Sequence, residues 1–143
     1  MTTGVQTPRP SLPVPVARMT ADEFARRYAG RGAELIDGIP LELPMPQQQH
    51  GKVCYRIAMA IGTIVDANDL GHVTTNDSFV RVGTKDDPER VRGADVCYFS
   101  YDRLPKGEMP PGLLSVAPNM VVEVRSPTDP WSDVFTKVGE YLG

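Results

Sequence analysis

The stretch GADVCYF, residues 93–99, holds a single acid, Asp95, within an apolar run that is typical of a buried β-strand. A second run, MVVEVR at residues 120–125, carries Glu123 in the same kind of surrounding. An ionised carboxylate is unstable in an apolar environment unless a partner neutralises it, and one divalent cation can neutralise two carboxylates. We therefore expect the two strands to be neighbours and the two acids to form a metal-dependent phosphodiesterase site.

Coulomb's law indicates why two such acids would need a cation. Two carboxylates about 4 Å apart repel by about 4 kcal/mol at an effective dielectric constant of about 20, which favours either protonation or a bound metal ion. Ligands that offer only oxygen suit Mg²⁺ or Mn²⁺ better than zinc. Taken singly, each acid also fits a structural role, with Asp95 at a strand end and Glu123 paired to Arg125 or another surface cation.

Length and composition bound the rest of the chain. The protein has 143 residues, of which 41% are hydrophobic and 23% charged, which is typical of one globular domain with a modest core. Residues 1–17 are rich in proline and poor in large apolar side chains, so we expect a disordered tail followed by one domain at 18–143. No run approaches the roughly 20 apolar residues of a membrane span and no signal peptide is recognisable, which predicts a cytoplasmic protein without a membrane partner.

Local patterns predict an α/β fold. Thr20 and Glu23 form a capping box, Asp37-Gly38 is typical of a tight hairpin turn, and Gly71 is expected to cap the helix before it. Asp129 and Pro130 are expected to cap and begin the last helix. The expected elements are a helix at 21–29, a β-hairpin at 33–43, a helix at 48–68, a strand at 73–82, the two acid-bearing strands and a helix at 131–142.

The charge and the cysteines give weaker signals. A net charge of −3 is unfavourable for a protein that binds nucleic acid, although a local basic rim can oppose it. We expect such a rim from four residues that precede Asp95, namely Arg81, Lys85, Arg90 and Arg92. Cys54 and Cys97 fit reduced structural thiols better than a disulfide framework or a zinc cluster.

Five segments carry a resemblance to a known family. They are ELIDG at 34–38, His50 at a helix start, DDPERVRGADV at 86–96, APNMVVEVRSP at 117–127, and Lys137 with Tyr141. Together and in this order they resemble the Uma-two family of bacterial restriction-endonuclease-like proteins, from about Met19 to the C-terminus. The resemblance implies the PD-(D/E)XK nuclease fold, with a mixed central sheet flanked by helices, and magnesium-dependent cleavage of DNA.

The resemblance also implies roles for particular residues. Asp95 and Glu123 would bind the metal ion, with the backbone carbonyl of Val124 as a further ligand. Glu34 would be an outlying acid on the hairpin, and His50 would lie at the mouth of the site. The alternatives are that Glu34 is an exposed hairpin residue and that His50 merely begins a helix.

A lysine usually follows the second acid of this nuclease superfamily by two residues, and Arg125 occupies that position here. Arginine stays charged and cannot accept a proton, so it would only assist by its charge. Lys137, one helical turn from Tyr141, is expected to replace the missing lysine. The alternative for Lys137 is an exposed ion pair with Glu140.

Two further differences from the family pattern have structural consequences. Ala94 stands where the family usually has proline, which affects backbone rigidity more than charge. The family continues beyond the last helix into another strand, whereas this sequence ends at Gly143. We therefore expect the last core strand to be missing and the open edge to favour pairing with a second copy as a homodimer.

Three functions are compatible with the sequence. The first is a magnesium-dependent DNA endonuclease, and the second is a catalytically inactive nuclease-fold module that interacts with nucleic acid or protein, which Arg125 and the acidic net charge favour. The third is a sugar-active enzyme, which is disfavoured because no aromatic-rich groove is apparent and Trp131 is the only tryptophan. No base-reading element is recognisable, so the sequence predicts no target specificity.

Overall fold

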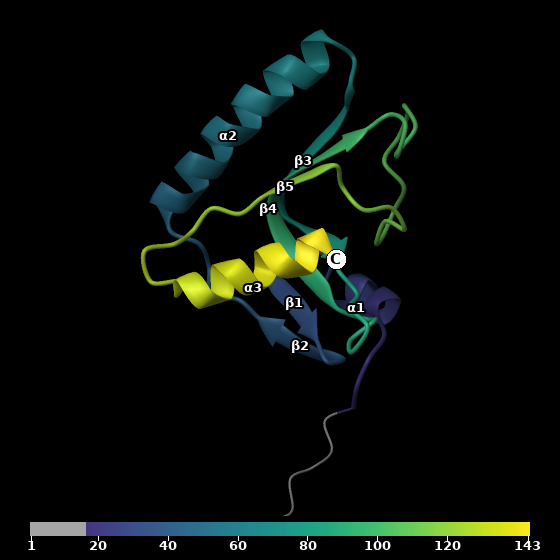
Figure 1. Cartoon of the computed structure of the whole chain (residues 1–143), viewed down its shortest axis with the longest axis vertical. Coiled ribbons are helices and arrows are strands. Elements are labelled where there is room, and N and C mark those ends of the chain that lie inside the picture. Colours follow the sequence, from purple (N-terminus) through teal and green to yellow (C-terminus); the bar gives the residue numbers. More distant parts are fainter. Residues whose placement is uncertain (1–16) are drawn as a thin grey trace, which may run out of the picture.

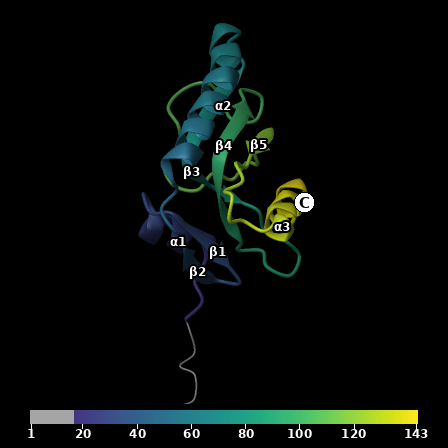
Figure 2. The ribbon, with the colours of Figure 1, turned by 90° about the vertical axis from the view of Figure 1, so that its left-hand side faces the viewer.

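The computed structural model describes residues 17–143, and it shows a sheet with helices on both sides (Figures 1 and 2). The elements are α1 (Ala21–Tyr28), β1 (Ala33–Ile36), β2 (Ile39–Glu42), α2 (Gln48–Ala67), β3 (Gly71–Arg81), β4 (Val91–Ser100), β5 (Met120–Val122) and α3 (Trp131–Leu142). The predicted order of elements is confirmed. The predicted disordered tail, except for Ala17, lies outside the described residues.

Strand β4 is the centre of the sheet, whose order is β2-β1-β4-β3 with β5 also paired to β4. β3 pairs with β4 along most of its length, while β1 and β5 share the opposite edge of β4 through Leu35↔Val91 and Val96↔Val122. The α/β fold class is confirmed. The expectation of a mixed sheet is wrong for the described residues, because every strand pairing among them is antiparallel.

The N-terminal elements form as their sequence dictates. The Thr20 hydroxyl accepts the backbone N–H of Glu23, which caps α1. Asp37 and Gly38 have φ angles of 51° and 72°, the left-handed pair that a two-residue hairpin turn requires. A Cβ at residue 38 would also lie 2.8 Å from the Cβ of Arg18, so the turn demands glycine for space as well as for conformation.

Two predicted helix caps differ from the structure. After α2 the left-handed residue is Asp69, with φ 52°, whereas Gly71 begins β3. A Cβ at residue 71 would lie 2.0 Å from the carbonyl oxygen of Phe99, so Gly71 serves the close approach of β3 to β4. At α3 the N-cap is Pro130 rather than Asp129, whose carboxylate instead accepts the N–H of Ser126 and closes the preceding turn.

The hydrophobic core has two clusters, one against α1 and one around the far half of β4. The first contains Ala21, Phe24, Ala33, Leu35 and Val91, and the second contains Val80, Val82, Ala94, Cys97, Phe99 and Leu104, with Tyr141 packed against it. Burying a side chain such as Phe24 contributes about 1.5–3 kcal/mol. Both clusters include β4 residues, so the strand that carries Asp95 is fixed along its length.

Helices α1 and α3 lie on opposite sides of the sheet, and their attachment differs (Figure 2). α1 buries three of its residues, whereas no residue of α3 is buried. Trp131, Phe135 and Leu142 are exposed on α3. Among the described residues, no helix combines the length and hydrophobicity that crossing a membrane requires.

Candidate active site

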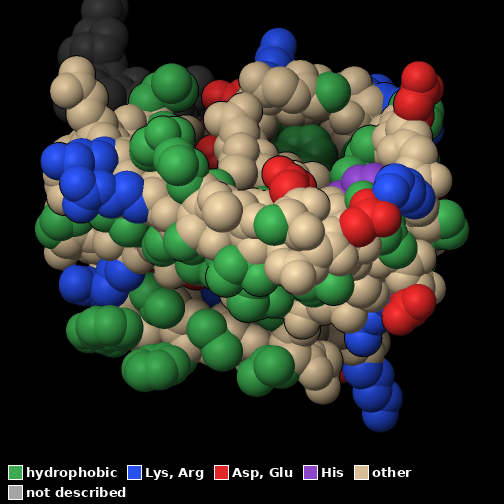
Figure 3. Space-filling model, turned by 90° about the horizontal axis from the view of Figure 1, so that it is seen from above, with side chains coloured by type: hydrophobic (Ala, Val, Ile, Leu, Met, Phe, Trp, Pro, Cys, Tyr) green, Lys and Arg blue, Asp and Glu red, His purple; other side chains and the backbone are tan. Residues whose placement is uncertain are grey.

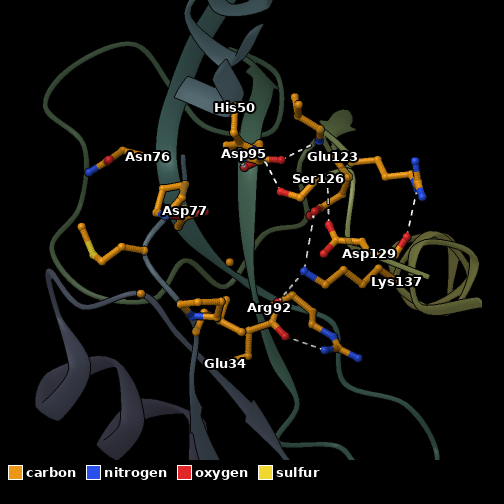
Figure 4. Close-up of a pocket in the computed structure, with 18 of the residues that line it drawn as sticks. Glu34, His50, Asn76, Asp77, Arg92, Asp95, Glu123, Ser126, Asp129 and Lys137 are labelled. Carbon is orange, nitrogen blue, oxygen red and sulfur yellow. Dashed lines mark hydrogen bonds and ion pairs between the residues drawn. The ribbon is translucent and has the colours of Figure 1, made fainter. Parts of the chain in front are cut away.

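A cleft of about 1280 Å³ lies where β1, β3, β4, the start of α2 and α3 meet. Its lining includes five side chains that the sequence motifs singled out, together with Asp77, and Figure 4 shows them turned toward the same space. The five are Glu34, His50, Asp95, Glu123 and Lys137. The fold therefore brings distant residues to one site: Glu34 and Lys137 are 103 positions apart in the sequence.

Asp95 is buried on β4 and is held by two groups of the protein. Its Oδ1 lies 2.9 Å from Nε2 of His50, and its Oδ2 accepts the backbone N–H of Val124 at 2.5 Å. The other ring nitrogen of His50, Nδ1, lies 3.4 Å from the hydroxyl oxygen of Ser126. His50 therefore contacts the site directly instead of only beginning a helix, and its ring is oriented from both sides.

Glu123 follows β5 directly and stands opposite Asp95 if the register of β4 and β5 is continued by one pair. Its Oε1 accepts the hydroxyl of Tyr141 at 2.6 Å, and its Oε2 lies 3.7 Å from the Nζ of Lys137. Burial raises the pKa of Glu123 above its ordinary value, with a further contribution from Asp95 that Tyr141 and Lys137 oppose.

Asp95 lies on β4 and Glu123 directly follows the neighbouring strand β5, and each acid has protein partners of its own. Asp95 uses His50 and Val124, whereas Glu123 uses Tyr141 and Lys137. The expectation that a shared cation neutralises both carboxylates stays a prediction. It is supported at Glu123, because no hydrogen bond within the described residues reaches its Oε2 and burial disfavours its charge.

Lys137 reaches into the cleft from α3 and lies 2.8 Å from Oε1 of Glu34, which is 1% exposed. Burial alone would lower the pKa of Lys137, but the hydrogen bond to Glu34 and the charge of Glu123 outweigh it and raise the pKa. The side chain is thus a fixed cation at neutral pH. The alternatives of an exposed Glu34 and of a Lys137–Glu140 pair are both excluded.

Glu140 instead binds the two arginines that flank the start of β4. Arg92 donates to both of its carboxylate oxygens, at 2.6 and 2.9 Å, and Arg90 donates to it as well. Burial would raise the pKa of Glu140, yet these bonds lower it below its ordinary value. Arg92 also donates to Oε2 of Glu34 at 2.6 Å, so the arginine joins this buried acid to the partly buried Glu140.

The predicted basic rim does not form. Arg90 and Arg92 are bound to Glu140, and Arg81 donates to Asp22 at 2.9 Å, which leaves Lys85 as the exposed member of the four without an ion pair in the described chain. Figure 3 shows the Lys and Arg side chains of one face in separate patches among acidic and apolar groups. The acidic partners of these arginines lie far away in sequence, which is why sequence inspection overestimated the free positive charge.

Arg125 is turned toward its own loop. Its Nε donates to the carbonyl of Asp129 at 3.0 Å, and its guanidinium carbon lies 4.7 Å from the centre of the Trp131 ring. Arg125 lines the cleft, but the turn at 126–129 supplies acceptors that hold its guanidinium, and its assistance at the acids stays a prediction. Val124 contacts Asp95 through its N–H group, and its carbonyl remains the ligand that the resemblance implies.

Asp77 is a site residue that the sequence did not reveal. Asn76 and Asp77 have φ angles of 69° and 52° and form an irregularity in β3 between Thr75 and Ser78. Burial, followed by the charge of Asp95, raises the pKa of Asp77. A usable signal was present, because Asn and Asp are the residues other than glycine that most readily adopt left-handed conformations, yet 73–82 was interpreted as a regular strand.

Cys54 lies one turn after His50 on α2, and burial together with the charge of Asp95 raises the pKa of its thiol to about 11. Both cysteines are free, as predicted. The ligand atoms of His50, Cys54 and Asp95 all lie within 4.8 Å of one another. Cys54 therefore adjoins His50 and Asp95, although it does not line the cleft itself, in contrast to Cys97, which is buried in the core.

Residues 21–142 match the family model Uma2, described as "Putative restriction endonuclease". The chain belongs to this family. The resemblance inferred from the sequence is thus confirmed, and the Uma2 family connects the chain with nucleases. This Uma2 chain differs from the pattern that the resemblance implies at Ala94 and Arg125, and Lys137 is the expected replacement for the missing lysine.

A solved structure also resembles this Uma2 chain. It is the crystal structure of a "putative nuclease belonging to DUF820" from Anabaena variabilis, with a TM-score of 0.67 and 21% sequence identity. The similarity covers 87% of this chain and 68% of the other, and it supports the nuclease-like fold. The chain has no significant match among curated proteins.

The residues present fit a metal ion of the kind that nucleases use. Three acids, Asp77, Asp95 and Glu123, line the cleft, and burial raises the pKa of Asp77 and of Glu123. A cation would relieve this unfavourable negative charge, and carboxylate oxygens are the ligands that Mg²⁺ and Mn²⁺ prefer. The donor set is therefore suitable, although His50 and Cys54 add nitrogen and sulfur beside it.

Proposed function

We propose that this protein is a metal-dependent DNA endonuclease that hydrolyses phosphodiester bonds with Mg²⁺ or Mn²⁺ as cofactor. One observation carries the proposal: a lysine from α3 lies 3.7 Å from Glu123, beside the strand that bears Asp95. An acid on β4, an acid directly after β5 and a partly buried lysine supply the positions at which a metal ion and a phosphate group can be held together. Family membership over residues 21–142 supports the same reaction class.

The proposed roles follow from the contacts. Asp95, Glu123 and the Val124 carbonyl would hold the metal ion, which when bound supplies a Lewis acid and a water molecule of lowered pKa. Lys137 stays protonated and would stabilise the negative charge that develops on the phosphate oxygens. It acts as a cation rather than as a proton acceptor, because Glu34 and Glu123 raise its pKa.

Three further side chains would position these groups. Tyr141 holds Oε1 of Glu123, and its own pKa is raised by burial and by Glu123, so it remains a hydrogen-bond donor. Glu34 fixes the ammonium of Lys137 at 2.8 Å. His50 orients Oδ1 of Asp95 at the mouth of the cleft. Each of these contacts keeps a reacting group in place before substrate arrives.

The surroundings of the proposed reaction are also inferred. We propose a cytoplasmic location, because free cysteines fit a reducing compartment that contains DNA. We propose a homodimer, because two active sites would allow cleavage of both strands and the sheet has edges that a second copy can pair with. Since Arg90, Arg92 and Lys137 are already paired with acids, DNA affinity should depend mainly on the metal ion.

Plasmid cleavage tests the proposal. Purified protein with Mg²⁺ or Mn²⁺ is expected to nick or linearise supercoiled DNA, and Asp95→Asn and Glu123→Gln are expected to abolish this activity. Lys106→Met is a matched control, because Lys106 is exposed, pairs with Asp69 and does not line the cleft. Absence of cleavage with either metal, or full cleavage by Asp95→Asn, would overturn the proposal.

A second candidate is a catalytically inactive module that binds nucleic acid or protein. It is favoured by one observation: both oxygens of Asp95 already have protein partners. This function predicts DNA or partner binding without cleavage, and binding that Glu123→Gln leaves unchanged. Fluorescence anisotropy with a labelled duplex, run beside the plasmid assay, distinguishes the two.

A further inference from the structure

The first two turns of α2 meet β4 at a group of three different ligand types. His50 offers nitrogen, Cys54 sulfur and Asp95 oxygen, and their ligand atoms all lie within 4.8 Å of one another. His50 and Cys54 are partly buried and Asp95 is buried. His50 and Asp95 line the cleft beside Asp77 (Figure 4), and Cys54 lies one helical turn after His50.

We propose that His50, Cys54 and Asp95 form a binding site for a zinc-class transition metal ion. The donor set decides the class of metal. Imidazole nitrogen and thiolate sulfur prefer Zn²⁺ or Co²⁺, whereas Mg²⁺ is held by oxygen ligands and water. Three protein ligands leave one position of a tetrahedral ion open, which is the arrangement of zinc sites that admit water or a substrate.

The geometry suits an ion of this size. Residues four apart on a helix project from the same face, so His50 and Cys54 approach β4 together. Bonds of about 2.0–2.3 Å to a tetrahedral zinc ion place its ligand atoms roughly 3.3–3.8 Å from one another. His50 Nε2 and Asp95 Oδ1 are 2.9 Å apart, and the remaining separations are at most 4.8 Å, so small side-chain rotations suffice.

Two of the three ligands are held in place by a second layer of contacts. Ser126 lies 3.4 Å from Nδ1 of His50, which leaves Nε2 facing Asp95. The N–H of Val124 holds the oxygen of Asp95 that does not face His50. Outer contacts of this kind orient the ligands of metal sites and commonly contribute 10–100-fold to metal affinity.

The proposed zinc site shares one ligand with the magnesium site proposed above and differs in the others. Glu123 and the Val124 carbonyl belong only to the magnesium set, and Cys54 belongs only to the zinc set. Asp95 is common to both. The inference does not rest on nuclease activity, because it concerns the binding of a metal ion to the protein alone.

Zinc titration of the metal-free full chain, without a histidine tag and without DNA, tests the proposal. Isothermal titration calorimetry is expected to show one zinc ion per chain. Cys54→Ser and His50→Ala should each weaken zinc binding by at least about 100-fold, since even outer contacts contribute 10–100-fold. Co²⁺ added to the wild type should give a thiolate-to-cobalt charge-transfer absorption that disappears in Cys54→Ser.

The chain supplies a matched control for each ligand type. It contains two cysteines and two histidines, and the second of each, Cys97 and His72, lies outside the proposed site. Cys97→Ala and His72→Ala should bind zinc as the wild type does. Far-ultraviolet circular dichroism of every variant identifies any that fail to fold, and the cobalt absorption of the wild type, which needs no variant, tests thiolate ligation directly.

Unchanged zinc affinity in Cys54→Ser would overturn the proposal, as would an equal loss in Cys97→Ala or a cobalt complex of the wild type without charge-transfer absorption. These results are separable from those of the cleavage assay. Protein that binds zinc through Cys54 but cleaves no DNA would refute the nuclease and keep this site. Protein that cleaves DNA but binds zinc independently of Cys54 would refute this site and keep the nuclease.

Discussion

The two ends of the cleft differ in whether their acidic side chains have cationic partners. At the paired end, formed by Glu34, Arg92, Lys137 and Glu140, each acid contacts a cation at 2.6–2.8 Å. At the acidic end, formed by His50, Asp77 and Asp95, no lysine or arginine of the described residues forms an ion pair with either acid, and His50 is hydrogen-bonded to Asp95. The contrast extends to the pKa values, which are lowered for Glu140 and raised for Asp77.

The comparison separates stability from function. Buried ions with good partners fix the fold, and removing one partner leaves an uncompensated charge. Buried acids without such partners disfavour folding, so a protein retains them only where a ligand, such as a cation, compensates. Four substitutions test whether this division is real.

The largest effect on stability is expected at the paired end, from Arg92→Ala. Arg92 is 7% exposed and joins Glu34 to Glu140, so its loss should lower the free energy of unfolding by about 3–5 kcal/mol. Urea denaturation measures the change. Arg27→Ala removes an exposed ion pair with Glu23 and should cost no more than about 1 kcal/mol. If both substitutions lowered the free energy of unfolding equally, buried ion pairs would contribute no more to stability than exposed pairs, contrary to this prediction.

At the acidic end, Asp95→Asn should reduce plasmid cleavage by about 100- to 1000-fold or more, because the neutral amide is a poorer ligand for a divalent cation. Its effect on the free energy of unfolding should be smaller than that of Arg92→Ala, since the substitution keeps the shape and removes a charge. Initial rates of nicking and urea denaturation measure the two effects. A large loss of stability with intact cleavage would reverse the roles assigned to the two ends.

Lys137 connects the ends, and Lys137→Met should reduce cleavage by about 100-fold while the protein still binds the metal ion. The reason is that the ammonium is expected to stabilise charge on the phosphate rather than to hold the cation. Cleavage rates across a Mn²⁺ titration separate a lower maximal rate from weaker metal binding. A variant restored to full rate by excess Mn²⁺ would contradict this role. Lys106→Met is the control.

The smallest effect is expected from Asp77→Asn, which should stabilise the metal-free protein at pH 7 by up to about 1 kcal/mol. The pKa of Asp77 is raised from 3.8, so its charge opposes folding once the pH rises above that value. Below pH 3.8 the carboxyl is protonated in both states and the benefit of the substitution should vanish. Thermal melts between pH 3.5 and about 7 measure this trend, with exposed Asp86→Asn as control. A benefit that grew on acidification would have the wrong sign.

Local sequence signals predicted most of the fold. Asp37-Gly38 predicted the position of the hairpin, and the apolar spacing of α2 predicted its bounds within one residue. The turn residues and Pro130 before Trp131 predicted the start of α3. The same signals could not show which residues pair across the chain. The partner of Arg92 is Glu140, 48 residues later, so the arginines were interpreted as a free basic rim.

The site was predicted in part for the same reason. The family motif identified five side chains that line one cleft in the structure, namely Glu34, His50, Asp95, Glu123 and Lys137. Asp77 was missed because two consecutive left-handed residues interrupt β3 without any change in its hydrophobic pattern. The direction of Arg125 depends on carbonyl groups of its own turn, which no periodicity reveals.

Helix α3 brings Lys137 into the cleft and Tyr141 to Glu123 although none of its residues is buried. An element with so little buried apolar surface opens at a lower free energy than the strands beneath it. Detachment of α3 would separate Lys137 from Glu34 and Tyr141 from Glu123 at the same time. The proposed cleavage reaction would then depend on whether α3 is docked, while the sheet stays folded. Backbone amides of α3 should accordingly exchange with deuterium well before those of β4.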